Sequence, residues 1–470
     1  MKFRHLIALA LVLQFTLSSL AQQPTQTAPG ASPANPQQPG LQPDDEVVKI
    51  TTNLVQVDAV VTDKNDRQIT DLRPDELEIF EDGKPQQITN FSYVSTEDGR
   101  AKPTEQSQRD SQREAKAIGP VPPIRLRQEQ VRRTIALVVD DLGLSFLSIS
   151  TVRQALKKFV DQQMQPGDLV AIIRTSGGIG ALQQFTSDKR VLYAAIEKIR
   201  WSVTSRGGIA VFAPMAAELE SKSLGDTPAT AAAHEDLDQF REELYTVGTL
   251  GALNYIVRGL RALPGRKSVI LLSDGMTVFN LQKTGVIERQ SSRVIEAQKR
   301  LVDLANRASV VIYTIDPRGI PTFGLQASDD VSNMSDADIQ ATLTKRSHDF
   351  ADSQAALGYL AQETGGLEIK NQNDISGGLR RVLDDQRGYY LIGYRPDEST
   401  FDKPGRIKFH HLSLRVKRPG KFNIRLRSGF LGVTQAQAVP TRTTRDQQLL
   451  GALVSPFGAE NVHLRSTSLF

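Results

Sequence analysis

The segment TIALVVDDLGLS, which runs from Thr134 to Ser145, decides the fold. Its first half, Thr134–Val139, is an almost unbroken apolar run, and runs of this kind form strands that are buried on both faces of a sheet. Its second half begins with Asp140 and Asp141 and continues through glycine and serine, which is a polar turn. The segment therefore predicts a central strand that delivers two carboxylates to one edge of a sheet.

Strand and helix patterns alternate along the chain from this segment onward. Short apolar runs predict the strands, and apolar residues at helical spacing predict the helices between them. Two of these helices end at Pro-Gly pairs, Pro166-Gly167 and Pro264-Gly265. The alternation predicts a doubly wound, Rossmann-like α/β fold with a mostly parallel sheet covered by helices on both faces. The predicted strands are Thr134–Val139, Leu169–Ile173, Val269–Leu272, Val310–Ile315 and Leu367–Ile369.

Strands of a different kind lie before and after this alternation. Val55–Thr62 alternates between the two faces of a half-buried strand, and Tyr389–Tyr394 and Ile407–Val416 return to strand patterns after the last helix. We therefore predict small β modules before and after the α/β domain. The predicted division is a signal peptide at 1–21, a Pro/Gln-rich linker at 22–45, a small β module at 46–95, a charged linker at 96–131, the α/β domain at 132–388 with insertions at about 207–247 and 319–350, a β extension at 389–435, and a tail at 436–470 that we expect to begin a truncated β element.

The N-terminus has the features of a secretory signal peptide. A basic start, Met1–Arg4, precedes the apolar run Leu6–Leu13, and the small residues Ser19 and Ala21 precede Gln22. The apolar stretch is shorter than the roughly 20 residues that a membrane span needs, and no later segment is apolar enough. We predict cleavage before Gln22 and an exported protein of the periplasm, the extracellular space or the cell envelope, without a transmembrane span in the mature chain.

The composition excludes several classes of function. The chain has 470 residues and no cysteine, which removes disulfides, thiolate metal ligands and cysteine nucleophiles. Its 57 Lys and Arg against 53 Asp and Glu give a net charge of +4, which is too balanced for a dedicated nucleic-acid binder. The sequence contains none of the G-x-S-x-G, H-E-x-x-H, G-x-G-x-x-G or P-loop motifs. We predict no nucleic-acid partner and no enzymatic activity.

Polar residues that follow the predicted strands form a candidate metal site. Ligands of open α/β sheets bind beyond the carboxyl ends of the strands. Asp140 and Asp141 follow the first strand, Asp274 lies within the turn Ser273–Gly275, and Thr249 opens a helix. Carboxylates and hydroxyls together suit Mg²⁺ or Mn²⁺. The spacing leaves a second interpretation open, in which the acidic pair caps the next segment and Ser273–Gly275 is an ordinary turn.

These motifs resemble a von Willebrand factor type A (VWFA) domain, similar to an acidobacterial subgroup of exported VWFA-related proteins. The resemblance runs from Arg132 to about Leu391 and depends on the strand that ends in Asp140, on Thr249–Leu253 and on Arg266–Gly275. It implies a divalent cation that is held by an Asp-x-Ser-x-Ser loop, a Thr and a second Asp, and that is completed by a carboxylate of a protein partner. The flanking segments that also resemble this subgroup are Val57–Asp63, Asp75–Lys84 and Gly388–Pro396.

The family ligands carry over to this chain in two frames. Asp140 matches the first Asp, but Leu142 and Leu144 then stand at both serine positions. A frame that begins at Asp141 places a glycine and Ser145 there and restores one hydroxyl. The ligands that the resemblance implies are Asp140, Asp141, Ser145, Thr249 and Asp274.

The sequence as a whole predicts an exported, non-enzymatic binding or adhesion-type protein whose VWFA-like domain binds a protein partner through Mg²⁺ or Mn²⁺. Two alternatives remain: a structural envelope scaffold with a degenerate metal site, and a metal-dependent hydrolase that uses Asp140, Asp141 and Asp274. The hydrolase lacks a His or Glu base near these strand ends. Residues 403–445 contain 11 Lys and Arg and no Asp or Glu, which predicts either contact with an anionic envelope surface or a solvated strand face.

Overall fold

The computed structural model describes most of the chain between the first predicted strand and the last, and every described residue belongs to one unit, Thr52–Phe470. The predicted signal peptide, the Pro/Gln-rich linker, most of the charged linker and the tail lie outside the described residues. No helix in the described part is long and apolar enough to cross a membrane. The described residues are 54–96, 130–177, 184–201, 228–276, 279–281, 287–290, 292–326, 329–332, 334–397, 400 and 408–432.

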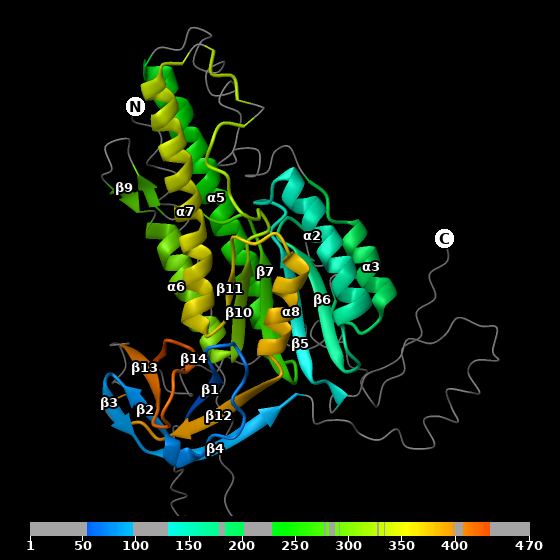
Figure 1. Cartoon of the computed structure of the whole chain (residues 1–470), viewed down its shortest axis with the longest axis vertical. Coiled ribbons are helices and arrows are strands. Elements are labelled where there is room, and N and C mark those ends of the chain that lie inside the picture. Colours follow the sequence, from blue (N-terminus) through cyan, green and yellow to red (C-terminus); the bar gives the residue numbers. More distant parts are fainter. Residues whose placement is uncertain are drawn as a thin grey trace, which may run out of the picture. The chain divides into compact units, whose positions relative to one another are not determined.

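A five-stranded parallel sheet forms the α/β part, with the strand order β11-β10-β7-β5-β6 (Figure 1). Every residue of β5 and of β10 is buried, as their continuous apolar runs predict. The doubly wound α/β fold is therefore confirmed. The strands are β5 Arg133–Val139, β6 Asp168–Arg174, β7 Arg266–Leu272, β10 Val310–Ile315 and β11 Glu368–Ile369.

Helices cover both faces of this sheet because successive residues of each strand point to opposite sides. Ile135 and Leu137 belong to an apolar core with α2, α3 and α8, whereas Ala136 and Val138 belong to a second core with α5, α6 and α7. The helices are α2 Phe146–Lys158, continued by η3 Phe159–Gln163, then α3 Lys189–Glu197, α5 Pro228–Leu260, α6 Ser292–Arg307, α7 Asp336–Thr364 and α8 Ile375–Asp385; β8 Phe279–Leu281 and β9 Ile287–Gln290 form a hairpin.

The sheet register brings the ends of three neighbouring strands together. Val139 pairs with Leu272, and Leu272 pairs with Ile315. Backbone hydrogen bonds continue one residue further, since Asp140 N–H donates to Leu272 O at 3.0 Å and Ser273 N–H donates to Ile315 O at 3.2 Å. The residues that follow β5, β7 and β10 therefore lie side by side at the carboxyl edge of the sheet.

The two predicted β segments share their sheets. One sheet has the order β14-β1-β12-β4 and the other β15-β13-β2-β3. Both contribute to one apolar core, in which Val57 and Tyr390 of the first sheet lie with Ile79 and Leu412 of the second. The strands are β1 Val55–Thr62, β2 Leu77–Glu81, β3 Lys84–Gln86, β4 Ile88–Ser95, β12 Gly388–Tyr394, β13 Phe409–Val416, β14 Asn423–Leu426 and β15 Gly429–Leu431, with η1 Pro74–Glu76 before β2.

Most basic side chains in the described part of the predicted basic segment are paired with acids. Among the described residues, this pairing offsets the positive charge of these side chains, and both interpretations of the segment stay open. Contact with an anionic envelope surface stays a prediction. The pairs are Lys408 with Asp82 at 2.8 Å, Lys417 with Glu78 at 3.3 Å, Arg418 with Glu76 at 2.8 Å, and Arg425 with Asp385.

Candidate metal centre

The carboxylate of Asp140 is the acceptor around which the carboxyl edge is organised. Thr249 does not open a helix as predicted but lies inside α5, which already begins at Pro228. Its Oγ1 donates to Asp140 Oδ1 at 2.9 Å, and Ser273 Oγ after β7 donates to Asp140 Oδ2 at 2.7 Å. A third hydroxyl, Thr175 Oγ1 after β6, lies 3.1 Å from Asp140 Oδ1. Asp140, Thr249 and Ser273 are fully buried. A buried carboxylate needs such donors, because burial without them is costly.

Asp141, the next residue, shares the Thr175 hydroxyl with Asp140 and is otherwise bound by the loop that follows β6. Its Oδ1 accepts from Ser176 N–H at 2.8 Å and from Thr175 Oγ1 at 3.2 Å, and Ser176 Oγ donates to its Oδ2. Arg174 Nη1 lies 3.6 Å from the same Oδ2. Asp141 therefore ties the end of β5 to the loop that follows β6.

Ser145 begins α2 as its N-terminal cap. Its Oγ accepts from Ser148 N–H at 3.2 Å and lies 2.9 Å from Ser148 Oγ, which satisfies a backbone donor of the first turn. The backbone N–H of Ser145 donates to Asp274 Oδ2 at 2.8 Å. Leu144, which stands at a family serine position, is fully buried in the apolar core. The loop is therefore fixed by packing and capping.

Asp274 differs from the other predicted ligands because one of its carboxylate oxygens accepts no hydrogen bond from the described residues. Its Oδ1 is shielded from solvent and has no hydrogen-bond donor among the described residues. Burial raises the pKa of Asp274, and the positive charge of Arg318 opposes that rise. The turn around it requires glycine, because Gly275 has φ +108° and a Cβ there would lie 2.6 Å from the backbone oxygen of Ser353 on α7.

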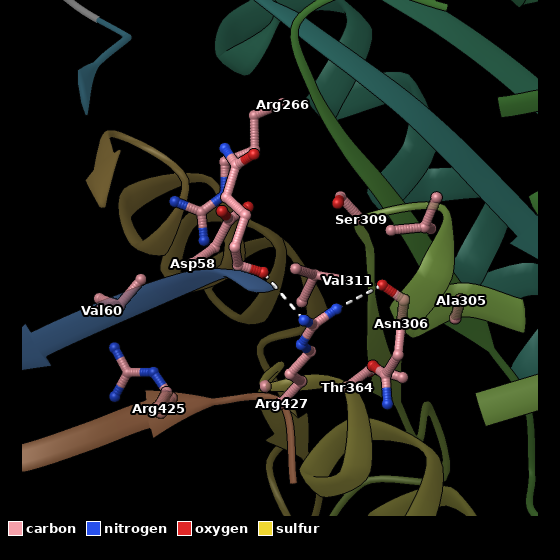
Figure 2. A pocket seen from close by; sticks show the side chains of 13 residues that line it. Asp58, Val60, Arg266, Ala305, Asn306, Ser309, Val311, Thr364, Arg425 and Arg427 are labelled. Atoms are coloured by element: carbon pink, nitrogen blue, oxygen red, sulfur yellow. Dashed lines mark hydrogen bonds between the residues drawn. The ribbon is translucent and has the colours of Figure 1, made fainter. Parts of the chain in front are cut away.

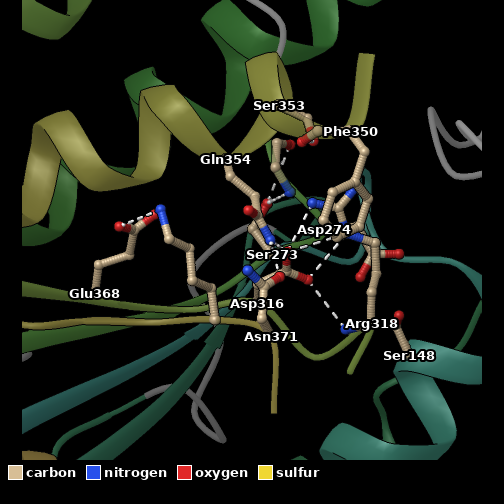
Figure 3. Close-up of polar contacts among 12 residues, drawn as sticks. Ser148, Ser273, Asp274, Asp316, Arg318, Phe350, Ser353, Gln354, Glu368 and Asn371 are labelled. Atoms are coloured by element: carbon tan, nitrogen blue, oxygen red, sulfur yellow. Dashed lines mark hydrogen bonds and ion pairs between the residues drawn. The ribbon is translucent and has the colours of Figure 1, made fainter. Parts of the chain in front are cut away.

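A buried ion pair that the sequence analysis did not identify completes the edge (Figure 3). Arg318 Nε and Nη2 donate to the two oxygens of Asp316, at 2.9 and 2.7 Å, and the two side chains are 9% and 1% exposed. Gln354 Nε2 donates to Asp316 Oδ2 at 2.7 Å, and the Arg318 guanidinium lies 4.1 Å from the centre of the Phe350 ring. The only signal in the sequence was an Asp-Pro-Arg turn directly after a strand.

The predicted ligands thus do not converge on one point. Asp140 and Thr249 are in contact, and so are the Ser145 backbone and Asp274. The Asp141 carboxylate is bound by Thr175 and Ser176, and the Ser145 hydroxyl by Ser148. Mg²⁺ requires near-octahedral oxygen ligands, and this arrangement does not fit it. Within the described ranges, no three His, Cys, Asp or Glu side chains form a group that could hold a metal ion. The cation remains a prediction.

Exposed apolar side chains lie beside this polar edge. Phe146 and Leu147, in the first turn of α2, are 65% and 77% exposed. The Phe146 ring makes an edge-on contact with Trp201, with the ring centres 6.0 Å apart. Ile320 and Leu325, in the loop after β10, are also exposed. The carboxyl edge therefore combines a buried polar centre with an apolar rim.

A second polar cluster lines a cavity where β1 and β14 meet β7, α6 and α7 (Figure 2). The cavity leaves about 30 Å³ for the centres of water molecules, enough for one or two waters. Arg427 donates from Nη1 to Asn306 O at 2.8 Å and from Nη2 to Gln56 O at 2.9 Å. Burial raises the pKa of Asp58, and the charges of Arg266 and Arg427 oppose the rise. None of the predicted metal ligands lines this cavity.

Comparisons with known proteins give only distant likenesses. No family model matches the chain, and no curated protein matches it. An aerotolerance-related membrane protein from Bacteroides fragilis NCTC 9343 with multiple mutations to serines has 13% sequence identity and a TM-score of 0.25, over 54% of this chain and 98% of that one. The conserved hypothetical protein BatB from Bacteroides thetaiotaomicron has the same identity and TM-score over 55% and 98%. At these values the likeness carries no argument about function, and the resemblance to VWFA domains stays a prediction.

Proposed function

We propose that the chain is an exported, non-enzymatic binding protein that captures a protein partner at the carboxyl edge of its parallel sheet. The observation that supports this proposal is the exposure of Phe146 and Leu147 at the first turn of α2. Adjacent exposed apolar side chains of this size are typical of protein interaction sites. Their position also agrees with the rule that open α/β sheets bind ligands at this edge.

The buried centre gives this rim a rigid base. Ser145 caps the helix that carries Phe146 and Leu147, and its backbone N–H is bonded to Asp274 at the end of β7. Rigid presentation favours binding, because side chains that are already ordered lose less entropy when a partner docks. The resemblance to VWFA domains, which the sequence motifs carry, also favours a protein partner at this edge.

Capture from an envelope extract tests the proposal. Immobilised wild type is compared with Leu147→Asp, which places a charge in the rim, and with Leu244→Asp as the matched control, since Leu244 is 59% exposed on α5. We expect a protein that wild type and Leu244→Asp enrich and that Leu147→Asp loses. The proposal is wrong if the three baits enrich the same proteins. A wild-type capture that fails in EDTA would instead favour the cation that the resemblance implies.

A structural envelope scaffold with a degenerate metal site is the second candidate. It is favoured by the positions of the implied ligands, because the Ser145 hydroxyl caps α2 and Leu144 fills the apolar core at a family serine position. This candidate predicts that wild type enriches no protein above an empty matrix, with or without Mg²⁺.

A further inference from the structure

We propose that Arg318 is the resident cation of the carboxyl edge, and that its guanidinium provides there the positive charge that a divalent metal would otherwise provide. This inference concerns the chain's own charges and does not depend on the proposed partner. It assigns a role to a residue that the sequence motifs do not include.

The register of β7 and β10 places the Arg318 guanidinium beside Asp274. β7 and β10 are parallel neighbours, and Leu272 is paired with Ile315 at their ends. The turn with Asp274 therefore lies beside the turn with Asp316 and Arg318, and Figure 3 shows the three labelled side chains together. Arg318 is also the strongest of the charges that lower the pKa of Asp274.

The guanidinium is held in place from several directions. Its forked hydrogen bonds to Asp316 fix its plane, and the ring of Phe350 lies against it. Gln354 in turn holds Asp316 through a hydrogen bond of 2.7 Å. A forked arginine–carboxylate pair has a defined geometry, and arginine keeps its charge at any pH at which the protein folds. The positive charge is therefore permanent and positioned.

The other carboxylates of the edge need no metal either. Asp140 accepts from the hydroxyls of Thr249 and Ser273. Asp141 accepts from the backbone N–H and the hydroxyl of Ser176 and lies near Arg174. The single Thr175 hydroxyl lies between the two carboxylates. Asp316 pairs directly with Arg318, and Asp274 feels its charge. A divalent cation that entered beside Asp274 would be repelled by this guanidinium.

Removal of the guanidinium should therefore make the thermal stability of the chain depend on a divalent metal, which we do not expect of the wild type. In Arg318→Gln, Asp274 and Asp316 remain as two neighbouring carboxylates without their shared counter-charge. A divalent cation that binds between them would stabilise the folded state, because a ligand stabilises the state that binds it. The wild type offers no such gain.

Thermal melts test this prediction without any partner. The full chain is melted as wild type, Arg318→Gln and the control Arg346→Gln, each in EDTA, in millimolar Mg²⁺ and in millimolar Mn²⁺. Arg346 forms an equally buried fork with Asp329, at 2.8 and 2.9 Å, so its loss controls for the loss of a buried ion pair. We expect Mg²⁺ or Mn²⁺ to raise the Tm of Arg318→Gln by roughly 2–4 °C and to leave the other two chains unchanged.

The result that overturns the proposal is a wild type whose Tm rises with Mg²⁺ or Mn²⁺, or an Arg318→Gln chain that folds and gains no response. If Arg318→Gln does not fold, Arg318→Lys is melted in its place. Lysine keeps the positive charge, so the Tm of Arg318→Lys should not change with metal. A metal-dependent Arg318→Lys chain overturns the proposal as well. Since no partner is present, failure of this test leaves the capture experiment unaffected.

Discussion

Replacing Thr249 with valine tests whether Asp140 is held by hydroxyl groups of the protein. Thr249→Val keeps the shape of the side chain and removes only the Oγ1 donor, which lies 2.9 Å from Asp140 Oδ1. Both residues are fully buried, so water cannot readily replace the lost donor. The Ser273 hydroxyl remains as a donor to the same carboxylate, and so does the Thr175 hydroxyl, which it shares with Asp141. The substitution therefore isolates one hydrogen bond to a buried charge.

The expected loss of stability follows from the strength of such bonds. A hydrogen bond to a charged group contributes about 1.5–3 kcal/mol. Because two donors remain, we expect Thr249→Val to lower the free energy of unfolding by about 2 kcal/mol. In a protein of this size, 1 kcal/mol shifts the Tm by roughly 1–2 °C, so the Tm should fall by roughly 2–4 °C.

Urea unfolding in EDTA, followed by circular dichroism, measures this loss. Thr344→Val is the matched control, because its exposed Oγ1 donates to Gln340 O at 2.8 Å within α7, and it should change stability by less than about 0.5 kcal/mol. The reasoning is refuted if Thr249→Val also costs less than about 0.5 kcal/mol in EDTA. A larger loss that appears only with Mg²⁺ would show that Thr249 serves a cation.

Three other contacts give predictions of the same kind. Gly275→Ala should lower the Tm by several degrees, because its φ is +108° and a Cβ would lie 2.6 Å from a backbone oxygen of α7. Asp168→Ala should cost about 3–5 kcal/mol in urea unfolding, since it leaves Arg133 buried without its forked partner. The hydrogen bond from Arg418 lowers the pKa of Glu76 to about 2, so its stabilisation is present above its ordinary pKa of 4.5 and lost as the pH falls toward 2. Stability measured across that pH range should therefore vary less in Glu76→Gln.

The α/β fold could be predicted because burial on both faces leaves a local mark in the sequence. All residues of β5 and β10 are buried, and such strands read as continuous apolar runs. The shared sheets of the β segments left no such mark. Val55 pairs with Tyr394, and Ala59 pairs with Leu426, so each pairing joins residues far apart in the chain. Alternation shows which face of a strand is buried and says nothing about its partner.

The centre could be predicted in part for a similar reason. The ends of parallel strands meet at one edge, which is why Asp140 and Ser273 come together, as their positions after two strands predict. Thr249 reaches Asp140 from inside α5, because the helix that was expected to begin there starts at Pro228. Spacing does not determine where a hydroxyl points, and the Ser145 hydroxyl serves the first turn of α2. The role of Arg318 could not be predicted, because one arginine in a turn leaves no motif or periodic pattern in the sequence. Its role emerges only from the register that places the turn after β10 beside Asp274.

Asp274 is the exception in a centre whose other acids are satisfied, and the exception bears on function. Burial raises the pKa of its carboxyl, and the charge of Arg318 opposes the rise. Because the pKa of Asp274 in the folded state lies above its ordinary value of 3.8, the folded protein loses stability as the pH rises from 3.8 through the raised pKa. Residues with strongly perturbed pKa values cluster at functional sites. Asp274 accepts a hydrogen bond from the backbone N–H of Ser145, and the exposed Phe146 is the next residue. This is where we propose that the partner binds.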